Sequence, residues 1–173
     1  MNSFMYTASV PVFKQMLASC KAILMKAEAH AAAKNIDAQV FLQGRLAPDM
    51  FSLMRQVQVA GDFAKGTAAR LAGVAIPEYQ DTEVSFADLY ARIDKTVAFI
   101  VSLTPAQFDG SETREIVLRP GTPKEMKFVG QPYLLHYAIP QFFFHITSTY
   151  GILRHLGLEI GKKDYMGQVN SVN

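Results

Sequence analysis

The sequence has a single cysteine, no tryptophan and no long apolar run. Cys20 excludes an intrachain disulfide and is typical of a reducing compartment. Because it lies on the apolar side of a predicted helix, we expect a buried, unreactive thiol. No apolar run approaches the roughly 18 residues that a membrane-spanning helix needs, and the first ten residues lack the basic start and apolar stretch of a signal peptide. These absences favour a soluble, cytoplasmic protein that does not contact membranes.

The sequence also lacks a large excess of either positive or negative charge. The 17 basic and 15 acidic residues leave a formal net charge of +2. Lys and Arg are scattered rather than gathered in runs or interleaved with aromatic residues, so nothing indicates nucleic-acid binding. No P-loop, GxSxG, HExxH, CxxC or glycine-rich dinucleotide motif occurs, which removes the usual patterns of phosphoryl transfer and hydrolysis. The residues leave open whether the protein is an enzyme.

What the sequence does have is hydrophobic periodicity. Half of its 173 residues are apolar, enough for one packed domain over residues 1–173. Apolar side chains recur at intervals of three and four, which predicts four amphipathic helices. They cover residues 10–34, 48–73, 86–103 and a last helix that starts at Tyr133 or Pro140 and ends near 156. With no sustained strand pattern, this predicts an all-α four-helix bundle.

The connections carry signals of their own. Ser85 and Asp88 form a capping pattern for the third helix. Between the third and fourth helices, residues 115–118 and 126–129 flank two prolines and a glycine, which predicts a small irregular hairpin. Because this connection is much longer than a simple helical hairpin needs, we expect a crossover there. The tail, 157–173, is expected to lie over the bundle or to fray.

One group of polar residues borders the apolar stripe of the last helix. Gln141, His145, Ser148 and His155 follow one another at spacings of four, three and seven, and Gln56 lies beside the stripe of the second helix. Such a seam could line a small-molecule pocket between helices two and four. Alternatively, these groups satisfy one another's hydrogen bonds. His145 is the best candidate for a base, an acid or a weak metal ligand.

Two further features of the sequence concern surfaces. Three consecutive aromatic residues, Phe142–Phe144, spread apolar surface around the last helix, and we expect a homodimer to supply part of the cover. Two sets of charges on or near helix two are typical of surface ion pairs and caps rather than of a substrate clamp. They comprise Arg45, Asp49 and Arg55, and Asp62, Lys65 and Arg70.

The segment HITSTYGILRHLG, residues 145–157, resembles the last-helix motif of the DinB/YfiT-like superfamily, and residues 45–73 are similar to its second helix. RLAPDM, PQFFFH and YGILRHLGLEIGKKDYMG further resemble a bacterial branch of unknown function. The resemblance covers nearly the whole chain. It implies a DinB-like four-helix bundle, often dimeric, and in many members a metal site built from one histidine of helix two and two of the last helix.

Carried over to this sequence, the resemblance implies an incomplete metal site. His145 matches the second histidine of the last helix, Gln141 occupies the place of the first, and Gln56 or Gln58 lies at the helix-two position. Amides are poor ligands for zinc or nickel, so we expect no metal cofactor. The leading hypothesis is a metal-free bundle that binds a small molecule around Gln56, Gln141, His145 and Ser148. The alternatives are a metal- or thiol-dependent transferase or hydrolase of the DinB type, and a dimeric structural or interaction module.

Overall fold

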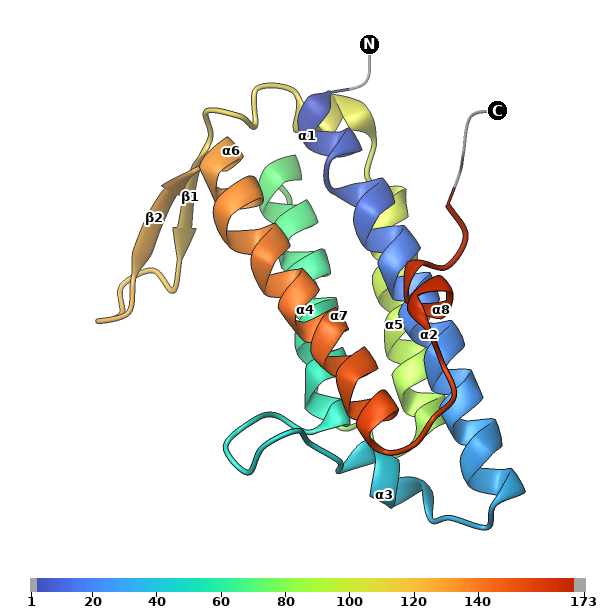
Figure 1. Cartoon of the computed structure of the whole chain (residues 1–173). Helices are drawn as coiled ribbons and strands as arrows, with labels where there is room; N and C mark the ends of the chain where they lie inside the picture. Colours follow the sequence, from blue (N-terminus) through green and yellow to red (C-terminus); the bar gives the residue numbers. More distant parts are fainter. Residues whose placement is uncertain (1–2, 170–173) are drawn as a thin grey trace.

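The computed structural model describes residues 3–169 and shows a bundle of four long helices, as predicted (Figure 1). These are α2 (Val10–Ala33), α4 (Leu53–Ala72), α5 (Phe86–Ser102) and α7 (Ile139–His155). The shorter elements are α1 (Phe4–Thr7), α3 (Ala38–Leu42), η1 (Pro105–Phe108), β1 (Glu115–Leu118), β2 (Met126–Val129), α6 (Gly130–Pro132), η2 (Tyr133–Ala138) and α8 (Lys162–Met166).

The core lies between the four apolar stripes. Phe13 of α2 meets Phe142 of α7 edge to face, with ring centroids 4.7 Å apart, an arrangement that adds to the area both rings bury. Cys20 is 1% exposed, and burial raises the pKa of its thiol to about 12. The thiol therefore stays protonated, as expected for an inert core position. Among the described residues, no helix is long and apolar enough to cross a membrane.

The connection between α4 and α5 runs the length of the bundle. After Gly73 the chain turns back along α4, so that the ring of Tyr79 lies 4.0 Å from Lys65 Nζ and Glu83 accepts a 2.7 Å hydrogen bond from Gln58. Since the chain returns to the beginning of α4 before α5 starts, these two helices are parallel. The prediction that the crossover lies between the third and fourth helices is wrong.

The later connection stays at one end of the bundle (Figure 1). Tyr133, just before α7, contacts Thr67 near the end of α4, whereas His145 contacts Gln56 near its beginning, so α7 is antiparallel to α4. This connection contains the predicted hairpin, in which β1 pairs antiparallel with β2, Ile116 opposite Phe128. Its length serves the hairpin rather than a crossover.

The boundaries of two helices differ in detail from the sequence prediction. α4 begins at Leu53 rather than near Pro48, because residues 44–52 form a loop that the backbone bond from Leu53 N to Gly44 O closes at 2.8 Å. The last helix is continuous from α6 through the π-helical η2 into α7, so it passes Pro140. Proline cannot make the regular i→i−4 bond, and a wider turn next to it is a known adjustment. The capping box of Ser85 and Asp88 is present as predicted.

Candidate functional site

His145 is held between α7 and α4 by one short hydrogen bond. Its Nδ1 lies 2.7 Å from Gln56 Oε1, and only 6% of the residue is exposed. Gln56 Nε2 donates in turn to the carbonyl of Phe51 at 3.3 Å, in the loop before α4. Because the amide nitrogen is used by that carbonyl, the amide oxygen accepts and Nδ1–H of His145 donates. The loop, α4 and α7 thus fix one orientation of the imidazole.

The protonation of this imidazole follows from its surroundings. Burial, and secondarily the positive charge of Arg55, lower the pKa of His145 below its ordinary value. A neutral ring whose Nδ1 carries the proton presents a lone pair at Nε2. Nε2 of His145 has no hydrogen-bond partner among the described residues. Within them, Arg92 Nε is the only side-chain nitrogen or oxygen that is both unpaired and shielded from solvent. The Nε2 atom of His145 therefore reaches solvent and can accept a hydrogen bond.

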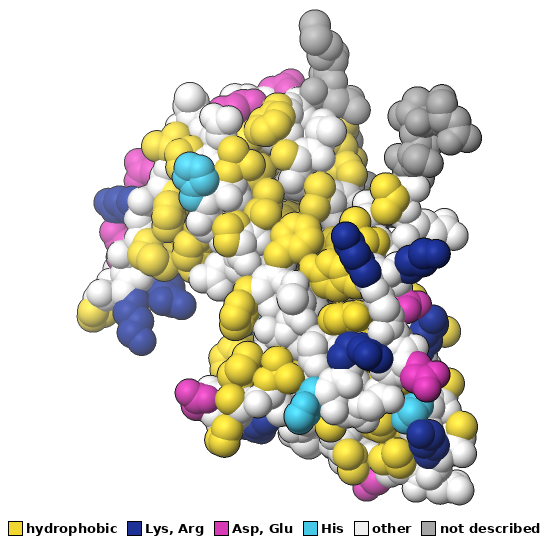
Figure 2. Space-filling model, in the orientation of Figure 1, with side chains coloured by type: hydrophobic (Ala, Val, Ile, Leu, Met, Phe, Trp, Pro, Cys, Tyr) yellow, Lys and Arg dark blue, Asp and Glu magenta, His cyan; other side chains and the backbone are white. Residues whose placement is uncertain are grey.

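The imidazole is part of a row of rings that crosses the face of α4 and α7. Neighbouring rings have centroids 5.1–6.4 Å apart, and Phe51 and Phe63 each lie at 20° to the imidazole plane. We call this set the aromatic row, and in order it comprises Phe51, His145, Phe63, Tyr137 and Phe128. Phe51 belongs to the loop before α4 and Phe128 to β2, so the row joins the loop to the hairpin. The molecular outline is indented between these two segments (Figure 2).

Two hollows border the aromatic row and share Tyr137. One, of about 270 Å³, is lined by His136, Tyr137, Pro140, Gln141 and Phe144. The other, of about 190 Å³, is lined by residues of α4, η2 and the hairpin: Asp62, Phe63, Arg70, Leu118, Arg119, Tyr133 and Tyr137. His145 lines neither hollow. Instead, one ring from each hollow packs on the imidazole. Phe144 of the larger hollow lies edge to face with ring centroids 5.2 Å apart, and Phe63 of the smaller hollow is stacked with centroids 5.7 Å apart.

The structure brings some of the candidate residues together and separates others. Gln56 and His145 are bonded directly. Gln141 is half-buried in the larger hollow, and Ser148 is buried further along α7, 7% exposed. Within the described residues, no hydrogen bond joins either side chain to His145. His155 is exposed and does not belong to the same group.

Gln58, the alternative to Gln56 for the helix-two position, serves the crossover instead. It accepts from Arg55 and donates to Glu83. Around it lies a set of three cations and three carboxylates joined by ion pairs, which we call the crossover cluster. Its members are Arg55, Lys65, Arg92, Asp62, Asp81 and Glu83. The expectation of surface pairs holds for Arg55, which pairs with Asp81, but the partners of Asp62, namely Lys65 and Arg92, are only 5% and 4% exposed and lie deeper than expected.

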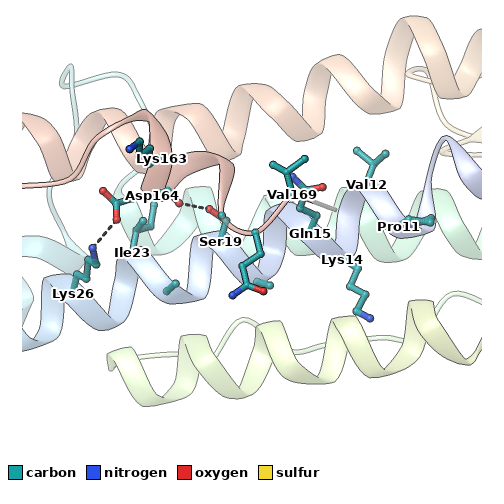
Figure 3. A pocket seen from close by; sticks show the side chains of 14 residues that line it. Pro11, Val12, Lys14, Gln15, Ser19, Ile23, Lys26, Lys163, Asp164 and Val169 are labelled. Atoms are coloured by element: carbon teal, nitrogen blue, oxygen red, sulfur yellow. Dashed lines mark hydrogen bonds and ion pairs between the residues drawn. The ribbon is translucent and has the colours of Figure 1, made fainter. Parts of the chain in front are cut away.

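A larger groove, of about 750 Å³, lies on the other side of the molecule, between α2 and the C-terminal segment (Figure 3). Its polar groups fasten that segment to the bundle: Lys26 pairs with Asp164 at 2.6 Å, and Ser19 Oγ is 2.6 Å from the carbonyl of Asp164. These contacts place residues 157–169 over the bundle, one of the two expected outcomes for the tail, and residues 170–173 lie outside the described part. Because Gln15, Ser19, Lys26 and Asp164 are engaged in holding that segment, the groove is a weaker candidate than the aromatic row.

Comparison with known proteins places the bundle in a family. The family described as "Domain of unknown function (DUF1993)" matches residues 5–166. The chain belongs to this family. It is also similar to a solved structure, described as a DinB family member protein from Shewanella denitrificans, with 40% sequence identity over 97% of this chain and 94% of that one and a TM-score of 0.90. No curated protein matches the chain. The DinB-like fold expected from the sequence is thereby confirmed for this DUF1993 protein.

The residues of this DUF1993 protein do not fit the metal site that the DinB resemblance implies. Two of the three positions hold amides, and the oxygen of Gln56 is already engaged by His145 Nδ1. Between residues 3 and 169, no group of three or more His, Cys, Asp or Glu side chains is arranged to hold a metal ion. One imidazole with neutral amides is a poor ligand set for zinc or nickel.

Several residues of the site were not identified from the sequence, namely Phe51, Phe63, Tyr137, Arg70 and Arg119. A signal existed for two of them, because Gln56, Phe63 and Arg70 are spaced by seven and lie on one face of α4. The loop and hairpin residues gave no such signal, since their positions depend on how the connections fold over the bundle.

Proposed function

We propose that this DUF1993 protein binds a small planar molecule on the aromatic row, with a hydrogen-bond donor of that molecule directed at Nε2 of His145. The observation that carries the proposal is a buried imidazole whose Nδ1 is fixed by Gln56 and whose Nε2 keeps a free lone pair. A solvent-accessible polar atom of defined orientation, on a largely buried side chain surrounded by aromatic rings, is typical of a ligand site.

The aromatic row supports a planar ligand. Phe63 and Tyr137 are half-buried and Phe51 is 50% exposed, so their rings offer apolar surface that a flat molecule would cover. Ring-on-ring packing contributes about 0.5–1.5 kcal/mol per pair beyond the buried area. The hydrogen bond to Nε2 adds about 1 kcal/mol and sets the orientation. Affinity would come from the rings and selectivity from His145.

Phenol and its methyl ether, anisole, test this proposal as a matched pair. Both carry one flat ring, but only phenol can donate to Nε2. We expect phenol to shift the imidazole nitrogen signals of His145 in NMR spectra and to bind more tightly than anisole. The variant His145→Ala should lose the preference for phenol, whereas His155→Ala, which removes an exposed histidine of the same helix, should keep it. Equal binding of both probes to the wild type would contradict the proposal.

A metal- or thiol-dependent enzyme of the DinB type is the second candidate, supported by the one retained imidazole. Elemental analysis of protein purified without a metal-affinity tag separates the two. Stoichiometric zinc, nickel or manganese would overturn the metal-free proposal. If neither a metal nor a phenol response at His145 is found, the third reading, a structural or interaction module, is the one that remains.

We also propose that the protein acts in the cytoplasm as a homodimer. The lone, buried Cys20 suits a reducing compartment. Phe144, 55% exposed on α7, is an apolar group that a second subunit would cover.

A further inference from the structure

The smaller hollow beside the aromatic row combines two arginines with two tyrosines. Arg70 reaches it from α4 and Arg119 from the hairpin, and Tyr133 and Tyr137 line it from η2. Arg70 is half-buried, with Nη1 3.5 Å from the Tyr133 hydroxyl. The two arginines come from elements far apart in the sequence and line one space of about 190 Å³.

The arginines of this hollow have no carboxylate partner within the described residues. Neither Arg70 nor Arg119 has an acidic oxygen within 4.0 Å, although eight ion pairs occur elsewhere. Asp62 also lines the hollow, but it already pairs with Lys65 and Arg92, both at 3.0 Å. The carboxylate of Asp62 is thus shared between two other cations, and within the described residues neither Arg70 nor Arg119 has an ion pair of its own.

The side chain of Arg70 lies back along α4, over Gly66. A Cβ at Gly66 would lie 2.7 Å from Arg70 Nη1, so the glycine leaves the space in which the guanidinium folds back along the helix. Arg119 lies at the hairpin turn with a φ of 52°, and its side chain is exposed. One arginine is thus half-buried beside the Tyr133 hydroxyl, and the other is exposed at the rim of the hollow.

We infer that this hollow binds the oxyanion group, a carboxylate or a phosphate, of the small molecule proposed above. Guanidinium groups pair with such oxyanions through charge-assisted hydrogen bonds, and the hydroxyl of Tyr137 can donate to one as well. The hollow is smaller than the roughly 300–1,000 Å³ of a complete ligand pocket, so it fits one group of a ligand. The inference rests on the proposed function for the rest of the ligand, whose ring would lie on Phe63 and Tyr137 toward His145.

Inorganic phosphate and acetate are the probes for this subsite, since each carries the oxyanion without the ring. We expect both anions, titrated at constant ionic strength, to shift NMR signals of Arg70, Arg119 and Tyr137. The anion that binds more tightly identifies the oxyanion group of the ligand. Arg119→Gln should weaken binding about tenfold, as should Arg70→Gln. Arg45→Gln removes an arginine whose one hydrogen bond among the described residues is to the Met50 carbonyl, and it should change anion binding less than about twofold.

The outcome separates this inference from the proposed function. Because Arg119 is exposed, Arg119→Gln should fold even if Arg70→Gln does not, and wild-type affinity of Arg119→Gln for both anions would overturn the inference. So would the absence of any anion response. His145→Ala should bind phosphate like the wild type. If the anions bind but phenol binding does not depend on His145, only the proposed function fails. If phenol binding depends on His145 but neither anion binds, only the oxyanion subsite fails.

Discussion

The side chain of Gln56 bridges His145 and the carbonyl of Phe51 through one buried and one partly buried hydrogen bond. Replacing it by leucine keeps its approximate volume but leaves Nδ1–H and that carbonyl without their partner. We expect Gln56→Leu to lower the free energy of unfolding by about 1–3 kcal/mol. Chemical denaturation measures this, with Gln141→Leu as the control, because Gln141 is half-buried and should change stability by less than about 0.5 kcal/mol. Equal losses in the two variants would contradict the geometry.

The lowered pKa of His145 makes stability depend on pH. Burial and Arg55 lower the pKa in the folded protein, so the unfolded chain takes up a proton first as the pH falls. Stability is then fully present above the unfolded value of about 6.5, and it is lost as the pH falls through the folded pKa, by at most about 1.4 kcal/mol per pH unit. Unfolding curves between pH 7.5 and 5 should show a shallower dependence for His145→Gln than for the wild type. His155→Gln should keep the wild-type slope.

Part of the candidate site could be predicted at this scale, because helical spacing places side chains on faces. Gln56 and His145 lie beside the apolar stripes of two helices, and the structure bonds them to each other. Spacing alone could not decide between Gln56 and Gln58, since both border the same stripe. Gln58 is instead bonded to Glu83 of the crossover, which leaves Gln56 for His145. This packing depends on residues far away in the sequence.

At the scale of the elements, the crossover between α4 and α5 is held mainly by Arg92. Its side chain, 3% exposed, pairs with Asp62, Asp81 and Glu83. Removing it would leave Glu83, 9% exposed, without its main cation. We expect Arg92→Met to lower the free energy of unfolding by about 3–5 kcal/mol and to speed amide exchange over residues 79–84.

Arg154→Met is the matched control for this element, because Arg154 is exposed and, within residues 3–169, its side chain bonds to the Leu158 carbonyl alone. It should change stability by less than about 0.5 kcal/mol. Unchanged exchange over residues 79–84 in Arg92→Met would show that the crossover is held by other contacts, such as those of Tyr79 with Lys65 and Lys95.

At the scale of the whole molecule, the four helices and the hairpin follow from local pattern, but the direction of α5 does not. Residues 74–84 carry turn-forming and polar residues that suit a short reversal as well as a crossover. What distinguishes the two is the buried pairing of Arg92 with this segment. In the sequence Arg92 reads as one charged residue of an amphipathic helix. Long-range ion pairs of this kind leave no periodic signal, so the location of the crossover could not be predicted.

The homodimer remains a prediction, and the face that carries the aromatic row is where we expect it. Three exposed apolar side chains gather there: Phe51 and Phe144 both contact His145, and Leu46 lies against Gly151 of α7. A charge at the centre of such a face would be buried without a partner in a dimer, which costs several kcal/mol. Phe144→Glu should therefore give a monomer in light scattering coupled to size exclusion, whereas Val101→Glu, an equally drastic change at an exposed position of α5, should leave the dimer intact. A monomeric wild type would overturn the prediction of a homodimer.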